Sequence, residues 1–169
     1  MAIKQAKEFG VSKKLATMLV FENNVTALGR ETAQGLKLVA SFYWDLSDET
    51  RAWSKRLMAR YGDKPPTIGQ VLAYLATTHY LKAVAARGTD DAAKVQARIL
   101  QQPIEGDLLQ HARIQPNGRV VSDMHIFEVK SPSESKSPID LYRLVATLPG
   151  TACSFLPKRA GALLSLADE

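Results

Sequence analysis

Apolar residues recur at two different spacings along this chain, and the change between them separates helical from extended stretches. Residues 15–21, LATMLVF, and 36–44, LKLVASFYW, are short apolar runs with little alternation. Such runs are typical of strands buried on both faces, as in a parallel sheet. Between them, residues 25–35 read as a helix that ends at Gly35. The pattern therefore predicts a right-handed βαβ unit with short links.

Helical spacing dominates the middle of the chain. Ser47 is a good N-cap, and Asp48 and Glu49 suit the first turn of the helix predicted to follow it. Two further amphipathic stretches follow, and each of the three ends near a glycine or a proline. The predicted helices span residues 47–62, 67–88 and 89–102, and a shorter one spans residues 2–9.

Alternation returns after Pro103. Residues 111–130, HARIQPNGRVVSDMHIFEVK, alternate on both sides of PNG, which is typical of a β-hairpin. Residues 131–138, SPSESKSP, read as a polar loop, and residues 141–148, LYRLVATL, read as a last strand. The chain is therefore predicted to be of the α/β class.

Composition and charge restrict the function. The chain has 169 residues, of which 46% are hydrophobic and 23% charged, as in ordinary globular proteins. The formal net charge is +5, but the 22 basic residues are spread among 17 acidic ones. No basic stripe with interleaved aromatic residues is present, so no nucleic-acid partner is predicted.

Metal, cofactor and membrane signals are weak. Cys153 is the single cysteine, which excludes an intrachain disulfide and a site with several cysteine ligands. His79, His111 and His125 lie far apart in the sequence, so no metal site and no cofactor are predicted. The N-terminus carries charges from position 4 and no apolar core, so it does not read as a signal peptide, and no run of 18 apolar residues occurs. As written, the chain is expected in the cytoplasm.

Polar residues follow the first predicted strand. Glu22, Asn23 and Asn24 lie where the strand gives way to a helix, and ligands of open α/β sheets collect at such strand ends. A carboxylate there suits a ligand ammonium group, and amides suit either polarity. The alternative is that Asn24 is only a helix N-cap and Glu22 is solvated, and periodicity alone favours this alternative.

Aromatic residues end the second predicted strand. Phe42 is expected in the core, and strand alternation sends one of Tyr43 and Trp44 inward. Tyr74 and Tyr80 lie on the long predicted helix, where they fit plain packing as well as contact with a ligand.

Signals of catalysis are lacking. Glu31, Asp45, Asp48 and Glu49 offer paired carboxylates, but no partner fixes one as acid and another as base. No GxSxG, P-loop or GxGxxG motif is present, and Cys153 has no evident base. The chain is therefore not expected to be an enzyme, and catalysis by Glu22 with Asp45 or Glu49 is a less favoured alternative.

Five segments follow one another in a recognisable order. They are AIKQAKEFGVSKK, LATMLVFENNVTALGRETAQGL, FYWDLSDETRAWSKRL, PTIGQVLAYLATTHYLKAVAARGTDDAAKV and ARIQPNGRVVSDMHIFEVK. In order and spacing they resemble the later part of type I periplasmic solute-binding proteins, the substrate-binding components of ABC importers in the branched-chain amino acid group. The resemblance covers about residues 2–150.

This resemblance implies a partial type I periplasmic-binding-protein fold, with Rossmann-like βαβ elements, a helical block and a C-terminal β-hairpin. Residues 1–45 would belong to the second lobe, and residues 46–105 would be a helical part of the first lobe. Residues 106–169 would carry the hairpin and tail back across the hinge to the second lobe. Proteins of this family close on a small solute by hinge motion and carry out no catalysis.

The resemblance also implies a ligand site. In the family, an acidic or polar residue just after the strand that matches LATMLVF contacts the amino group of the ligand. Glu22 occupies this position here, with Asn23 and Asn24 beside it. The implied partners are a small polar solute, such as an amino acid or amide, and the membrane permease of an ABC importer for the full-length protein in the periplasm.

Aromatic positions of the family also have matches. Tyr74 matches a commonly aromatic position near the cleft, and Tyr43 and Trp44 match the strand end that enters the hinge. The resemblance therefore implies that these side chains line the cleft or its hinge.

This chain departs from the family in length. Members carry a signal peptide and a complete first half, so the chain is expected to be a C-terminal piece with one wall of the ligand site. The helices over residues 47–102 would then expose an apolar face through which two copies could dimerise. A half-cleft buries little of a solute, so weak affinity is expected. The alternatives are a self-associating remnant with a role in protein interaction and a small-molecule sensing domain.

Overall fold

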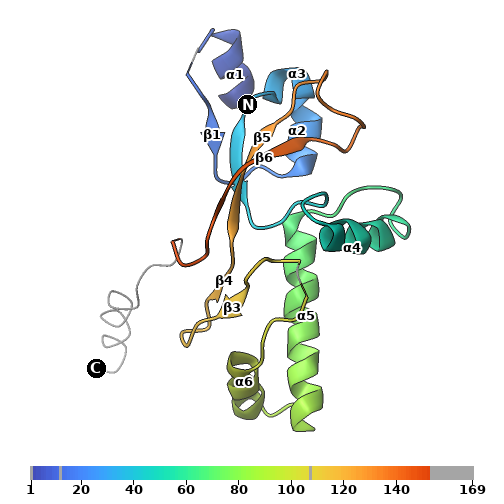
Figure 1. The fold of residues 1–169 in the computed structure, drawn as a ribbon, viewed down its shortest axis with the longest axis vertical. Helices are drawn as coiled ribbons and strands as arrows, with labels where there is room; N and C mark the ends of the chain where they lie inside the picture. The colour runs from blue at the N-terminus through green and yellow to red at the C-terminus, as the bar shows by residue number, and fades with distance from the viewer. Residues whose placement is uncertain (1, 12, 107, 153–169) are drawn as a thin grey trace.

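The computed structural model describes residues 2–11, 13–106 and 108–152. Figure 1 shows two parts, one built on a β-sheet and one built on helices with a hairpin. The chain passes from the sheet part to the helical part after residue 40 and returns before residue 124. Cys153 and the rest of the C-terminal tail lie outside the described residues.

A mixed sheet forms the first part. Its four strands are β1 (Ala16–Thr17), β2 (Lys37–Ala40), β5 (Met124–Val129) and β6 (Tyr142–Leu148), in the order β1-β2-β5-β6. β1 and β2 are parallel, and the other pairs are antiparallel. Since helices lie between β1 and β2 in the chain, the predicted βαβ unit is confirmed.

Three short helices accompany this sheet. They are α1 (Ala2–Glu8), α2 (Glu22–Leu28) and α3 (Arg30–Ala33). Gly29 separates α2 from α3 with a φ of 85°, a value that glycine adopts without strain. Val25 and Ala33 are fully buried, so α2 and α3 supply one layer of the core.

The core of the first part lies between these helices and the sheet. Leu38, Phe127 and Val129 come from neighbouring strands and are almost fully buried. Burial alternates along β5, whose second, fourth and sixth residues are buried. Tyr43 and Tyr142 complete the same cluster.

The second part contains three helices. α4 (Asp48–Met58) begins at Ser47, which accepts a hydrogen bond from the backbone N–H of Thr50, so the predicted N-cap is confirmed. α5 (Ile68–Arg87) is the longest helix and ends at Gly88, whose φ is 62°. α6 (Ala92–Gln101) begins at Asp91 and runs back along α5.

The predicted hairpin is confirmed at β3 (Arg113–Ile114) and β4 (Val120–Val121), which are antiparallel. A second core lies between α5 and the segment before this hairpin, where Phe42, Val71, Leu108 and Leu109 are buried. Trp44 packs against both cores, so it lies at the junction of the two parts.

The predicted strand over residues 15–21 is wrong in length and burial. Only Ala16 and Thr17 are extended in a ladder, and Met18 and Leu19 are 83% and 77% exposed. β1 is the edge of the sheet, so no further strand among the described residues pairs with its outer side. The helix predicted from residue 25 begins at Glu22.

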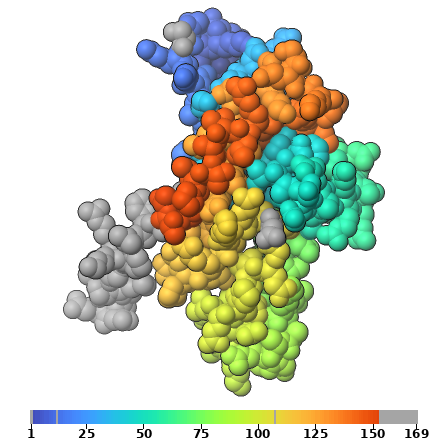
Figure 2. Space-filling model, in the orientation of Figure 1, coloured from blue at the N-terminus to red at the C-terminus, as the bar shows by residue number. Residues whose placement is uncertain are grey.

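The opposite edge of the sheet is also open. Six of the seven residues of β6 are exposed, and the strand runs across the surface from the first part toward the second (Figure 2). No helix within the described ranges combines the length and apolar character that a membrane crossing requires.

Candidate functional site

The start of α2 places three of the predicted site residues. Glu22 is the first residue of the helix, and Phe21 is its N-cap. The Asn24 side-chain oxygen accepts a hydrogen bond from the Phe21 N–H at 3.0 Å, and the Asn23 side-chain oxygen accepts one from the Asn24 N–H at 3.0 Å. Both amide side chains are exposed and close the first turn.

The capping alternative for these residues is wrong in two respects. Asn24 is the third residue of the helix and not its N-cap, because the helix begins three residues earlier than predicted. Glu22 is not solvated, since only 7% of it is exposed. The periodic pattern misplaced it because Val20 and Phe21 were counted as strand.

Glu22 is a buried carboxyl group without a counter-ion. Burial raises its pKa from 4.5 to about 7, partly offset by a hydrogen bond from its own backbone N–H. No cation among the described residues forms an ion pair with it. The group would therefore interact favourably with any cation that reaches it.

Tyr142, on β6, accompanies Glu22 in this buried region. Burial raises the pKa of its hydroxyl group, and the charges of Glu22 and Tyr43 raise it further. The Tyr142 hydroxyl group is buried and has no hydrogen-bond partner within the described part of the chain. Buried polar groups without a partner are rare in proteins, so the Tyr142 hydroxyl group is available to a ligand near Glu22. Sequence reasoning missed Tyr142, because strand alternation alone does not distinguish it from a packing tyrosine.

Tyr43 and Trp44 both bind the loop that precedes β6. The Tyr43 hydroxyl group and the Trp44 indole N–H donate to the carbonyl oxygen of Ile139, at 3.2 and 3.0 Å. The Tyr43 hydroxyl oxygen also accepts from the N–H of Leu141 at 2.9 Å. Burial is the largest of the effects that raise the pKa of Tyr43 to about 12.

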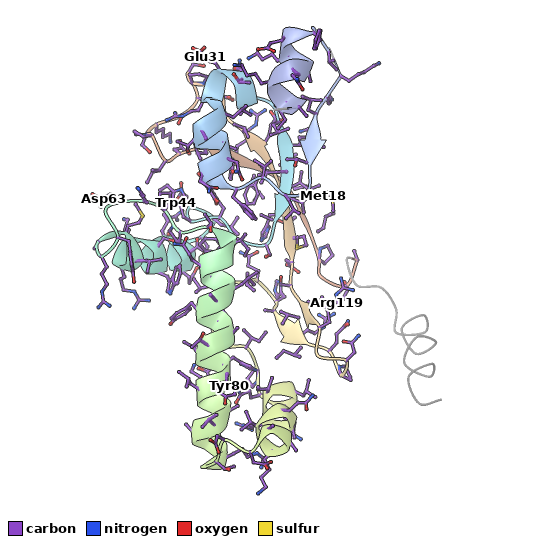
Figure 3. All side chains as sticks on the ribbon, turned by 180° about the vertical axis from the view of Figure 1, so that it is seen from behind. Met18, Glu31, Trp44, Asp63, Tyr80 and Arg119 are labelled. Carbon is purple, nitrogen blue, oxygen red and sulfur yellow. The ribbon has the colours of Figure 1, made fainter. Side chains whose placement is uncertain are left out.

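Exposure separates these two aromatic residues. Tyr43 is almost fully buried, with its ring 4.9 Å from that of Tyr142 and 5.5 Å from that of Phe127. Trp44 is half-buried, and Figure 3 places it beside α4 and the upper end of α5. Trp44 is therefore the aromatic side chain of this pair that retains surface for a ligand.

Several hydrogen bonds hold the loop that carries the Ile139 carbonyl. Asp140 is buried, and its carboxylate accepts from the Lys130 ammonium group at 2.5 Å and from the Lys136 N–H at 2.9 Å. The Asp140 carbonyl oxygen accepts from the Ser135 hydroxyl group at 2.5 Å. Sequence reasoning treated this segment only as a polar loop, although it supports both aromatic residues of the site.

Tyr74 lies apart from this cluster. It is on α5 and 45% exposed, and its ring is 5.2 Å from that of Trp53 on α4. Tyr74, Trp53 and Arg56 line a hollow of about 690 Å³ between α4 and α5. The structure thus brings Glu22 and Tyr43 to Tyr142, with Trp44 beside Tyr43, and it places Tyr74 on the helical part.

The chemistry of the cluster suits an organic cation. A buried carboxyl group, a phenol and an indole ring are groups that attract an ammonium ion. The described residues contain no group of three or more His, Cys, Asp and Glu that could hold a metal ion.

Comparison with known proteins gives the family. The family model described as "Periplasmic binding protein" matches residues 1–136. The chain belongs to this family. The family and its structural neighbours are ABC-transporter solute-binding proteins and not enzymes. A search among curated proteins found no match.

Solved structures of periplasmic binding proteins agree with this assignment. A periplasmic binding protein from Burkholderia mallei is 43% identical with a TM-score of 0.85, covering 93% of this chain and 42% of its own. A branched chain amino acid ABC transporter periplasmic ligand-binding protein from Burkholderia xenovorans is 37% identical with a TM-score of 0.80, covering 88% of this chain and 40% of its own. The predicted family and partial type I fold are confirmed.

A more distant structure shows the same fold. The solute binding protein of an ABC transporter from R. palustris, in complex with benzoate, is 20% identical with a TM-score of 0.70. The match covers 87% of this chain and 39% of that one. This chain thus spans about two fifths of the length of the periplasmic binding proteins that it matches.

Proposed function

We propose that this chain supplies one wall of the solute-binding cleft in the periplasmic component of an ABC importer. The observation that carries the proposal is the buried Glu22 carboxyl group, which has no counter-ion and lies with Tyr142, Tyr43 and Trp44. The solute is a small polar molecule with an ammonium or amide group. The name of the Burkholderia xenovorans relative, at 37% identity, supports an amino acid.

Each site residue has a role in this proposal. Glu22 accepts hydrogen bonds from the ammonium group of the solute, and Asn23 and Asn24 contribute amides at the mouth of the site. Trp44 covers the apolar part of the solute, while Tyr43 fixes Trp44 through their shared acceptor. Tyr74 contributes from the helical part.

The two parts of the chain would belong to the two lobes of the binding protein. The sheet part, residues 2–40 and 124–152, would form part of the second lobe, and the helical part with its hairpin would form part of the first. Trp44 lies where the chain crosses between the two parts and packs against both cores, which supports a hinge there. Closure of the lobes would bury the solute.

Two protein partners are proposed, one from this role and one from the exposed apolar face. The first is a membrane permease, which receives the solute in the periplasm. The second is another copy of this chain, bound through the exposed apolar face of the helical part. Leu72, Tyr80 and Val120 line a largely apolar hollow of about 460 Å³ there, between α5, α6 and the hairpin.

Affinity is expected to be low for the chain by itself. A single wall leaves much of a bound solute in water, so little apolar area is buried. Binding of L-isoleucine is therefore expected in the millimolar range or weaker, and micromolar binding to the monomer would contradict the one-wall proposal.

Nuclear magnetic resonance tests the site directly. Titration with L-isoleucine should perturb the backbone amides of residues 22–24 and the indole N–H of Trp44. Benzoate, which lacks an ammonium group, should perturb them less. Glu22→Gln should remove the response to L-isoleucine, and the control Glu31→Gln, on the exposed side of α3, should keep it. Equal responses to the two solutes would overturn the role of Glu22.

A further inference from the structure

Asp123 lies where the chain returns from the hairpin to the sheet. It is between β4 and β5, and only 7% of it is exposed. Its backbone N–H donates to the carbonyl oxygen of Gln110 at 2.9 Å. A buried carboxylate is thus fixed at a crossing between the two parts of the chain.

The carboxylate of Asp123 binds two segments that are distant in sequence. One oxygen accepts from the backbone N–H of Gly150 at 2.9 Å, just beyond the end of β6. The other lies 2.7 Å from His111 Nδ1, which donates because a carboxylate only accepts. The hydrogen bond from His111 is the main cause that lowers the pKa of Asp123.

The backbone of His111 supports a special role for this contact. Its φ is 51°, which is uncommon for a residue other than glycine. Its side chain is 81% exposed, so packing does not explain this conformation. Strained backbone persists where surrounding contacts hold it, and Asp123 supplies contacts to both Gln110 and His111.

Gly150 packs directly on the crossing. A Cβ atom at this position would lie 2.8 Å from the carbonyl oxygen of Ser122, closer than real Cβ atoms approach. The segments at 122–123 and 150 are therefore in backbone contact, and the contact is fixed by one carboxylate.

We propose that Asp123, His111 and Gly150 form a hinge latch that sets the angle between the sheet part and the helical part. Asp123 is the positioning residue. From the segment between β4 and β5, its carboxylate binds Gly150, after β6, and His111, before β3. The inference rests on the proposed function only in taking the two parts as lobes that move. The titratable groups that act on Asp123 are His111 and His125.

Distance measurement between the two parts tests the latch without any solute. Spin labels at Glu31→Cys and Arg87→Cys, in a Cys153→Ser background, report on the sheet part and on the end of α5. Asp123→Asn should broaden the distance distribution between the labels. In the same variant the Gly150 amide should exchange about tenfold faster, since it loses an ionic acceptor.

Two companion variants make the result decisive. His111→Gln changes an exposed side chain and should broaden the distribution to a smaller extent, even where Asp123→Asn folds poorly. Asp90→Asn, at an exposed carboxylate before α6, should leave both readouts unchanged. A distribution that is equally narrow in the parent, Asp123→Asn and His111→Gln would overturn the latch.

Solute binding and the latch are thereby separated. The absence of a response to L-isoleucine, together with a broader distance distribution in Asp123→Asn, would support the latch and oppose the proposed site. L-Isoleucine binding together with an unchanged distance distribution in Asp123→Asn would support the proposed site and oppose the latch.

Discussion

Tyr43 and Trp44 donate hydrogen bonds to the same carbonyl oxygen, that of Ile139, although they are consecutive residues at a strand end. Regular alternation would send their side chains to opposite faces. Since β2 ends at Ala40, both residues lie beyond the ladder and can turn toward one loop. Their rings are 6.0 Å apart. The Ile139 carbonyl thus links Tyr43, in the core, to the half-buried indole of Trp44.

The first prediction concerns the Tyr43 hydroxyl group. Tyr43→Phe should lower the free energy of unfolding by about 1–3 kcal/mol, because the N–H of Leu141 loses a buried acceptor. Urea denaturation measures this change. The control Tyr61→Phe, at a residue that is 68% exposed, should differ from the parent by less than about 0.5 kcal/mol. Equal effects of the two substitutions would contradict the role of this hydrogen bond.

The second prediction concerns the pH dependence that Glu22 imposes. Its pKa is raised from 4.5 to about 7 in the fold, so the folded chain holds a proton that the unfolded chain has lost. Its contribution to the stability is therefore present below pH 4.5 and is lost as pH rises through 7. Glu22→Gln should remove this loss and raise the free energy of unfolding at pH 8 by about 2 kcal/mol.

Urea denaturation between pH 4 and pH 8 checks this expectation. The matched control Glu31→Gln removes an exposed carboxylate and should keep the pH dependence of the parent. If Glu22→Gln and the parent show the same slope, Glu22 is not buried as a neutral acid.

The third prediction concerns His125, which is fully buried on β5. Burial lowers its pKa, while the charge of Asp123 raises it to a lesser extent. The stability that the neutral ring contributes is present above the unfolded-state pKa of about 6.5 and is lost as pH falls below it. His125→Gln should remove this loss, and His79→Gln should retain it. Thermal melting from pH 7.5 to pH 5 compares the three proteins.

The fourth prediction pairs two glycines. Gly150→Ala should destabilise the chain by about 1–3 kcal/mol, because the added methyl group meets the backbone of Ser122. Gly69→Ala should stabilise it by about 0.4–1 kcal/mol, since the added Cβ would meet Thr67 Oγ1 at 3.7 Å, an ordinary van der Waals distance. Opposite signs in the melting temperature are expected, and a stabilising Gly150→Ala would show that the crossing relaxes freely.

Local signals in the sequence predicted most of the fold. The Ser47 cap, Gly88 after α5 and the PNG turn each correspond to an observed boundary or turn, whereas the helix predicted to end at Gly62 ends at Met58. These features depend on neighbours within a few residues, so they are readable without tertiary information. The run at residues 15–21 misled, because apolar residues at an open sheet edge have the same composition as a buried strand.

The candidate site was less readable. The position of Glu22 after a strand was visible, but Tyr142, whose hydroxyl group feels its charge, is 120 positions away. The same holds for Asp123, whose partners at 111 and 150 come from separate elements. Contacts over such separations leave no periodic trace in a single sequence.

The two open edges of the sheet differ in how many residues they can pair with a strand of another copy. β6 has seven residues along its free edge, whereas β1 has two. Antiparallel pairing of β6 with β6 of another copy would use the same edge of both copies, so it would end at a dimer. Pairing of β6 with β1 of another copy would leave one free edge at each end, so copies could add to form a filament. Because β1 is so short, it gives a second copy too few residues to pair with, and this limits the growth of a continuous sheet through many copies.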